Sequence, residues 1–345
     1  MNRKVWKRVA LLAAVLALLI LVAQVVMAQT SYEAVAVSAT TAGTTEDGVD
    51  YDPNDILVRV TGEFTPTAAA VDTYWWKLFD GDDYGLDTRH VINALDVIED
   101  GDCGLDCAYG ALMSFKAQSV KVPGITPKVD GQDLVFTYFY EPPVPPGTFE
   151  LVFDGSDVGL TTIEEKIDGV DYWYPEMVSA NDVELPYDCT EGVLFISTQA
   201  AYRVPAANGG SLVGDGSDIL IFCATNFGPN TTGFWFRGHD ESDHDLSPSN
   251  VMSDIDVEGA ELIGPEAVED EAAFLYFTFI AHQTFTGEGG AAGGPSEVFY
   301  FPAECDYSGY GGPVIDFNQD WPALNGKATG YDYLGYFYPA SNVDC

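Results

Sequence analysis

The sequence predicts an all-β protein: a single β-propeller with four blades of four antiparallel strands, closed by a C-terminal strand that joins the N-terminal blade. Three observations lead to this fold class. Short apolar runs alternate with Gly, Pro and Asp, these runs recur in four related copies, and the two ends of the chain carry complementary parts of one copy. Strands that are apolar on both faces need a sheet on either side, and sheets stacked around an axis provide this.

The first 28 residues have the composition of a secretory signal peptide. Four basic residues precede an apolar run over residues 9–23, and small side chains follow before residue 29. We expect cleavage between Ala28 and Gln29, which makes residues 1–28 a signal peptide and residues 29–345 the propeller domain. An uncleaved membrane anchor is the alternative. No second apolar run of spanning length follows, so no membrane span is expected after cleavage.

The charge of the chain limits its partners. The formal net charge is −40, and removal of the first 28 residues takes away four of 14 basic residues and none of 54 acidic ones, which leaves −44. Nucleic acid and anionic lipid both need a basic surface, so neither is an expected partner. Disorder is the usual consequence of such charge. Here the 13% aromatic content predicts a folded core, with the carboxylates confined to loops.

A motif that ends in leucine recurs four times. Its clearest copy, at residues 149–160, reads FELVFDGSDVGL, and residues 76–86 read WKLFDGDDYGL. Weaker copies lie at residues 234–246 and 313–324. The closing leucines are 74, 86 and 78 residues apart: Leu86, Leu160, Leu246 and Leu324. This spacing leaves room for four short strands in each repeat, as a propeller blade requires.

Other motifs divide each repeat into strands. Residues 130–136 read DGQDLVF and residues 215–221 read DGSDILI, with looser copies at 52–58 and 294–300. These runs are rich in β-branched and aromatic residues and are bounded by turn residues, which is a strand pattern.

The two ends of the chain complete one repeat. Residues 33–38 have the character of a second strand, but no first-strand motif precedes them. Such a motif lies at residues 331–339, which resemble residues 167–175. The N-terminal blade would then take its inner strand from the C-terminal part of the chain, and this exchange would close the ring.

Six cysteines follow the signal segment, and an even number in an oxidising compartment predicts disulfides. Their positions relative to the expected strands favour the pairs Cys189–Cys223, Cys305–Cys345 and Cys103–Cys107. A metal–thiolate site is the alternative.

The FDGSDVGL phrase at residues 153–160 resembles a repeat of uncharacterised secreted bacterial proteins. The resemblance extends over the four repeats, is strong in two copies and implies no activity. A four-bladed propeller also resembles the hemopexin-like folds, in shape only, since the chain has no hemopexin sequence motif.

Paired aspartates in the loops are candidate Ca²⁺ ligands. The Asp-Gly-x-Asp turns between second and third strands and the Asp-Gly loops between fourth and first strands would emerge on one face of the disc. Oxygen ligands on glycine-containing turns suit Ca²⁺. The alternative is that Asp-Gly forms tight, solvated turns. The candidate residues are Asp80, Asp83, Asp130, Asp133, Asp154, Asp157, Asp215 and Asp218.

Two further ion sites are predicted. A ring of polar side chains at the starts of the inner strands would surround the channel mouth and would repel unless solvated or bridged by a cation. Its members are Asn93, Asp168, Asp256 and Asp332. The third repeat carries two histidines among acids, and His239, Asp243 and His244 would suit a transition metal or Zn²⁺.

No catalytic motif is apparent, so the sequence favours a secreted, non-enzymatic binding or display module. Its ligand would be an extracellular molecule or surface component, with Ca²⁺ as a stabilising ion. The alternative is a secreted metal-assisted hydrolase or lyase acting on polysaccharide or phosphate ester. Four nearly equivalent acidic loops favour display, whereas the irregular third repeat favours the enzyme.

Overall fold

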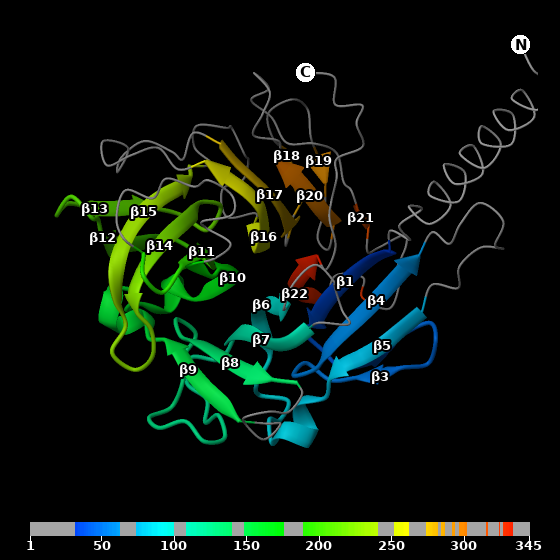
Figure 1. Cartoon of the computed structure of the whole chain (residues 1–345). Helices are drawn as coiled ribbons and strands as arrows, with labels where there is room; N and C mark the ends of the chain where they lie inside the picture. The colour runs from blue at the N-terminus through cyan, green and yellow to red at the C-terminus, as the bar shows by residue number, and fades with distance from the viewer. Residues whose placement is uncertain are drawn as a thin grey trace, which may run out of the picture.

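The computed structural model confirms an all-β chain made of antiparallel sheets (Figure 1). It describes residues 32–62, 74–99, 108–139, 148–175, 189–240, 252–261, 274–281, 284–286, 292–293, 297–301, 315–316, 324 and 327–333. Three short 3₁₀ turns lie in these ranges: η1 (Gly81–Tyr84), η3 (Gly155–Val158) and η4 (Ile163–Glu165). The predicted signal peptide lies outside the described residues. Within them, no helix is long and apolar enough to cross a membrane.

The first sheet joins strands from the two ends of the sequence. Its order is β22 (Ala328–Tyr333), β1 (Tyr32–Ala39), β4 (Ile56–Gly62) and β5 (Tyr74–Phe79). Strand β22 is antiparallel to β1 and pairs residue 332 with residue 36. The expected pairing of a late strand with the N-terminal sheet is therefore present.

Three more sheets of four strands follow in chain order, each with neighbouring strands antiparallel. The second consists of β6 (Ile92–Glu99), β7 (Ala108–Phe115), β8 (Leu134–Tyr138) and β9 (Phe149–Phe153). The third consists of β10 (Ile167–Trp173), β11 (Val193–Thr198), β14 (Ile219–Asn226) and β15 (Thr232–His239). The fourth consists of β16 (Met252–Glu261), β17 (Phe274–Ala281), β20 (Glu297–Phe301) and β21 (Ile315–Asp316).

Three two-stranded ribbons were not predicted from the sequence. They are β2 (Gly43–Thr44) with β3 (Asp50–Tyr51), β12 (Tyr202–Pro205) with β13 (Ser211–Gly214), and β18 (Phe285–Thr286) with β19 (Ala292–Gly293). Their strands have only two to four residues, which is too short for a hydrophobic period to develop. The described strands therefore form four sheets of four strands and three of two, which differs from the predicted grouping into four blades of four strands alone.

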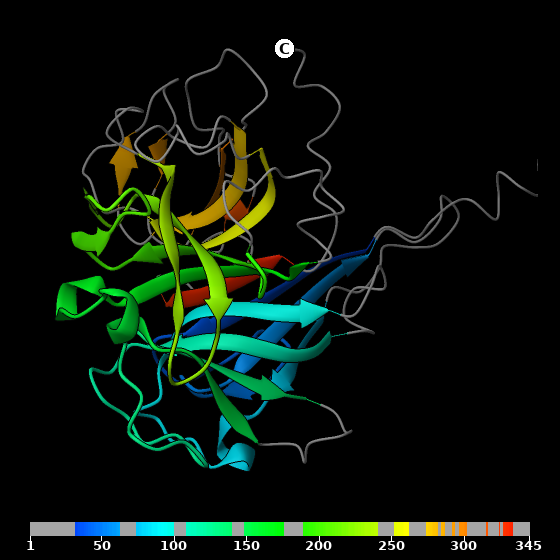
Figure 2. The same cartoon turned by 60° about the vertical axis from the view of Figure 1, so that its left-hand side comes forward.

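The first strands of the four sheets contact one another in sequence. Strand β6 contacts β22 and β10, and β16 contacts β10 and β22. Figure 1 shows these four strands near the middle of the molecule, with the later strands of each sheet farther out, and Figure 2 shows the same central strands from the side. The inner strands therefore form the part of the fold where all four sheets meet.

The core fills the space between sheets with large side chains. Phe153 of β9 contacts Phe222 of β14 with ring centroids 5.2 Å apart, which packs the second sheet against the third. Trp235 is 1% exposed, and its indole N–H donates to the carbonyl of Val158 over 2.8 Å. Aromatic runs thus serve as packing between sheets, as large flat side chains commonly do.

The predicted disulfide between Cys189 and Cys223 is present, with Cα atoms 5.0 Å apart. It ties the segment before β11 to the adjacent strand β14, where Cys223 faces Val193. A disulfide is compatible with an extracellular location. The other two predicted pairs, Cys305–Cys345 and Cys103–Cys107, lie outside the described residues.

Candidate functional site

In the first three sheets, the turns between second and third strands share one hydrogen-bonding pattern. In each, the carboxylate of the last aspartate accepts the backbone N–H of the residue three positions earlier. The distances are 2.8 Å for Asp55 with Asp52, 2.9 Å for Asp133 with Asp130, and 3.1 Å for Asp218 with Asp215. The three carboxylates are buried, with 1–6% of each residue exposed. Asp at this position therefore closes its own turn.

The same carboxylates hold the next loop in place. Asp133 accepts the N–H of Gly155 over 3.2 Å, and Asp55 accepts the N–H of Gly81 over 3.0 Å. Glycine is required here because a Cβ on Gly155 would lie 2.4 Å from the carbonyl oxygen of Gln132. The Asp-Gly repeat thus has a packing reason, and it brings the two predicted sets of acidic loops together in the first two sheets.

A basic side chain pairs with the loop aspartate in two of the first three sheets. Lys77 of β5 places its ammonium 2.8 Å from a carboxylate oxygen of both Asp55 and Asp80. In the third sheet, Arg237 of β15 forms an ion pair with Asp240. Both cations stand three residues before the loop aspartate that they contact.

Leu151 occupies the corresponding position in the second sheet. Strand register establishes the match: Lys77 faces Leu57, Arg237 faces Leu220 and Leu151 faces Val135, and each pair adjoins the same irregular step in its ladder. The loop aspartate three residues after Leu151 is Asp154. The second sheet therefore has the acidic junction without the cation that the other two carry in their strand.

The carboxylates of this junction have raised pKa values. Burial raises the pKa of Asp133 to about 7, with contributions from the charges of Asp130 and Asp154 and against the backbone N–H donors. Burial also raises the pKa of Asp130, with a contribution from Asp154. Lys166 passes close to Gly131, but its ammonium donates to the carbonyl of Lys116 over 2.9 Å.

The other predicted loop ligands have separate environments. Asp154 accepts the backbone N–H of Ser156 over 3.1 Å and its hydroxyl over 2.7 Å, which caps η3. Asp83 and Asp157 are exposed within η1 and η3. Asp218 also accepts the hydroxyl of Tyr202 over 2.9 Å, and burial, followed by the charge of Asp218, raises the pKa of that phenol.

In the described ranges, no group of three or more His, Cys, Asp or Glu side chains is arranged to hold a metal ion as it stands. Of the predicted third-repeat site, His239 is 2% exposed at the end of β15, opposite Ile219. Asp243 and His244 lie outside the described residues.

The predicted polar ring of the inner strands spans more than one level. The side-chain amide of Asn93 donates to the carbonyl of Ile167 over 2.7 Å, whereas Asp332 contacts the backbone N–H of Val97. Four residues of a strand extend over about 13 Å, so Asn93 and Asp332 lie at different heights. Asp256 belongs to β16, but its side chain lies outside the described atoms.

Asp168 of this group has a strongly raised pKa. It is 5% exposed, and burial raises its pKa to about 8 against the hydrogen bond that it accepts from Ser197 over 3.1 Å. A buried carboxylate of this kind holds its proton near neutral pH.

Three carboxylates join successive sheets, and the sequence analysis had singled out only one of them, Asp332, as a candidate ion ligand. In each case, an aspartate of one first strand accepts a backbone N–H of the next. The distances are 2.7 Å for Asp332 with Val97, 2.9 Å for Asp96 with Tyr172, and 2.9 Å for Asp171 with Val257. Asp96 and Asp171 both lie four residues after an isoleucine that begins its strand, Ile92 or Ile167. This shared distance from the start of the strand could have pointed to the two aspartates. Their role follows only from the contacts that they make with the first strand of the next sheet.

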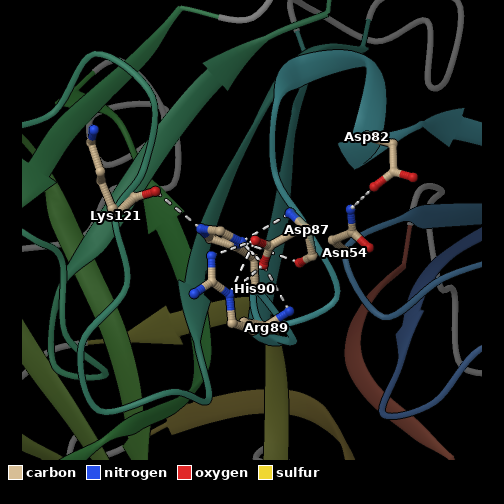
Figure 3. Close-up of polar contacts among 6 residues, drawn as sticks. All are labelled: Asn54, Asp82, Asp87, Arg89, His90 and Lys121. Atoms are coloured by element: carbon tan, nitrogen blue, oxygen red, sulfur yellow. Dashed lines mark hydrogen bonds and ion pairs between the residues drawn. The ribbon is translucent and has the colours of Figure 1, made fainter.

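Figure 3 shows a second polar cluster, in the loop that leads from η1 to β6. His90 is 3% exposed, and its Nε2 donates to the carbonyl of Lys121 over 3.2 Å, while its Nδ1 lies 3.0 Å from the N–H of Asp87. The Arg89 guanidinium beside Asp87 lowers the pKa of that carboxyl. Asn54 donates to Asp82 over 3.1 Å and secures η1. These contacts position loops.

In comparisons with protein-family models, curated proteins and solved structures, nothing matches this chain. The described residues nevertheless divide its carboxylates into two groups. Buried ones hold turns, loops and neighbouring sheets, and exposed or half-buried ones stand on the loops so held. The second group presents carboxylate oxygens, which are hard ligands and hydrogen-bond acceptors.

Proposed function

We propose that the chain is an exported, acidic, non-enzymatic module that presents carboxylates to an extracellular ligand or surface component. The scaffold would be a four-bladed β-propeller, with β22 completing the first blade. Cyclic contact among the four first strands supports this arrangement. The acidic rim, as we name it, consists of the exposed or half-buried aspartates in two kinds of segment of the first two sheets, the turns between second and third strands and the 3₁₀ turns η1 and η3 with the residue before each: Asp52, Asp80, Asp82, Asp83, Asp130, Asp154 and Asp157.

The module would bind Ca²⁺ at the junction of the second sheet. The observation that carries this proposal is Leu151, which stands where Lys77 and Arg237 supply a positive charge in the other sheets. Three carboxylates of one junction repel one another unless protonated or bridged. Ca²⁺ takes six to eight oxygen ligands and suits such a site.

The ligands would be Asp130, Asp133 and Asp154. Asp133 is held by its two backbone donors, while Asp130 and Asp154 are half-buried and would supply the remaining carboxylate oxygens. A bound ion would neutralise the junction as Lys77 does in the first sheet. It would also lock η3 against the preceding turn, which stiffens the part of the rim that a ligand would meet.

Isothermal titration of the purified, disulfide-intact chain with CaCl₂ tests the site. We expect binding that Leu151→Lys abolishes, because the new ammonium would occupy the cation position. Leu151→Met keeps the site uncharged and serves as the matched control. Failure of the wild-type chain to bind Ca²⁺, or binding that Leu151→Lys leaves unchanged, would refute the calcium proposal.

Export is tested separately by the N-terminal sequence of the protein recovered from its natural host. Cleavage before Gln29 would support the signal-peptide prediction, whereas an intact N-terminus on membrane-associated protein would favour the anchor. Binding of the recovered chain to the host's own surface, lost when the rim aspartates are replaced by asparagine, would support display. Equal binding by the charge-depleted variant would contradict it.

A further inference from the structure

We propose that the connection between β7 and β8 is a docking surface for an extracellular polysaccharide whose sugars carry carboxylate groups. The surface is the lysine loop, which we define as residues 116–129, and the ammonium groups of Lys116, Lys121 and Lys128 bind the carboxylates. It is a second surface, opposite in charge to the acidic rim. It rests on the proposed function only for the extracellular setting, since neither the rim nor Ca²⁺ takes part.

The first argument is the charge of the loop. The lysine loop contains three lysines and no acidic residue, in a chain with 54 acidic residues. The same connection in the first sheet, residues 40–51, contains three acidic residues and no basic one. In the third sheet, residues 199–214 contain a single arginine and no acidic residue. A local concentration of positive charge in so acidic a protein favours an anionic partner at this one connection.

The second argument is that the described residues supply no counter-charge. All three lysines are exposed, and within the residues that the structure describes none of them forms an ion pair. Asp168 lies near enough to feel the charge of Lys116, but burial raises its pKa to about 8, so the carboxyl holds its proton at pH 7. Asp168 therefore does not neutralise Lys116, and the three ammonium groups remain available to an external anion.

The third argument is that two of the lysines are neighbours. Val120 and Val129 form an antiparallel bridge with two backbone hydrogen bonds, of 2.7 and 3.0 Å. Lys121 follows the first valine and Lys128 precedes the second, so the two lysines lie next to each other across the bridge. Both valines are buried and both lysines are exposed. Like charges placed opposite each other on paired strands repel, and an anion bound between them would remove that repulsion.

The fourth argument is that the loop is held in one conformation. The backbone N–H of Lys116 donates to the carbonyl of Val91 over 2.8 Å, and His90 donates to the carbonyl of Lys121 over 3.2 Å. Figure 3 shows the ammonium end of Lys121 directed away from His90. The apolar side chains of the loop belong to the buried cluster of the first two sheets: Val120, Val122, Ile125 and Val129. A ligand would therefore meet the lysines without having to order the backbone that carries them.

The polar character of the loop favours a polysaccharide over a protein or a nucleic acid. No large apolar side chain of the loop is exposed, whereas protein interfaces depend on buried aromatic and apolar anchors. The exposed neighbours of the lysines are Gln118, Ser119 and Thr126, which can pair with sugar hydroxyls. Duplex DNA carries one charge per about 1.7 Å, and the acidic remainder of the chain would repel it. A polysaccharide with one carboxylate per sugar is less densely charged and so meets less repulsion.

Biolayer interferometry of the full, disulfide-intact chain on immobilised polygalacturonate tests the surface, in a chelating buffer of low salt so that Ca²⁺ plays no part. We expect binding that weakens as salt is added, and no binding to neutral dextran. Lys121→Gln/Lys128→Gln should lower the affinity by about tenfold, because two ammonium contacts are lost. Lys121→Arg/Lys128→Arg keeps both charges and should retain the affinity.

Two controls separate the lysine loop from the overall charge and from the acidic rim. Arg203→Gln/Lys327→Gln removes the same amount of charge elsewhere and should leave the affinity unchanged. Replacement of the rim aspartates by asparagine should not weaken binding to polygalacturonate, so failure of the display proposal and failure of this one give different results.

Three outcomes would overturn the proposal. The first is no binding of the wild type to polygalacturonate, and the second is an equal loss of affinity in the lysine variant and its charge-matched control. The third is a different occupant of the surface. Equal affinity for duplex DNA would assign it to nucleic acid, and self-association in sedimentation experiments that Lys121→Gln/Lys128→Gln abolishes would assign it to a second copy of the chain.

Discussion

The first and second sheets contain the same acidic junction with opposite solutions to its charge. In the first, Lys77 lies between Asp55 and Asp80, at 2.8 Å from each. In the second, Leu151 takes the position of that lysine, and the pKa of Asp133 rises to about 7. The hydrogen bonds that close the turn and hold the next loop are the same in both. The repeat therefore keeps its geometry while its charge balance is set by one side chain.

Replacement of Lys77 should cause the largest loss of stability among the changes that compare the two sheets. Lys77→Leu leaves Asp55, which is 1% exposed, beside Asp80 without a counter-charge. We expect a loss of about 2–3 kcal/mol in the free energy of unfolding, less than for a fully buried pair because the lysine side chain is 23% exposed. Urea denaturation at pH 7 measures it. Added CaCl₂ should recover part of the loss, and the exposed-pair variant Arg89→Ala should cause none that is measurable.

The close contact between the 3₁₀ loop and the preceding turn should contribute equally to stability in the first and second sheets. Gly155→Ala and Gly81→Ala each place a Cβ 2.4 Å from a backbone oxygen. Both should cost about 1–3 kcal/mol of stability, through displacement of η3 or η1. Thermal unfolding measures the cost. A large loss in one sheet and none in the other would show that the two junctions are not equivalent.

Buried carboxylates should make the protein less stable as the pH rises. The folded-state pKa values of Asp133, about 7, and Asp168, about 8, lie above the value of about 4 for an unfolded aspartate. The folded state then binds the extra protons, so stability is highest near pH 4 and falls up to pH 7–8. The slope is at most about 1.4 kcal/mol per pH unit for each group.

Denaturant titrations from pH 4 to pH 9 check this dependence. Leu151→Lys should weaken the dependence of stability on pH below pH 7, because a neighbouring ammonium lowers the pKa of Asp133. Asp168→Asn should flatten the slope up to pH 8. Stability that increases between pH 5 and pH 8 would contradict both assignments.

Exposed aspartates of the acidic rim should have the smallest effect on stability. Asp83→Asn and Asp157→Asn should each change the unfolding free energy by less than about 0.5 kcal/mol, since both side chains are exposed. Differential scanning calorimetry checks this in both sheets. A marked change in only one of them would reveal a further difference between the two junctions.

The local pattern made several structural features predictable. Strand runs, the bond between Cys189 and Cys223, and the pairing of a late strand with the N-terminal sheet all follow from short-range composition and from repetition. The match of Leu151 to Lys77 and Arg237 could be read from the repeat, since each stands three residues before its loop aspartate. The sequence did not reveal that this position in the first sheet lies beside the buried carboxylate of the preceding turn, because that contact depends on the pairing of the strands.

By itself, the amino-acid sequence determined the all-β class, the four related repeats, the acidic loops and the local disulfide. These features depend on alternation, turn residues and spacing within some tens of residues. Only the tertiary structure decided which carboxylates work inside the scaffold, because a carboxylate such as Asp96 acquires its role from a strand more than seventy residues away. Burial and register between sheets, which no local pattern encodes, separate a structural aspartate from one that is displayed.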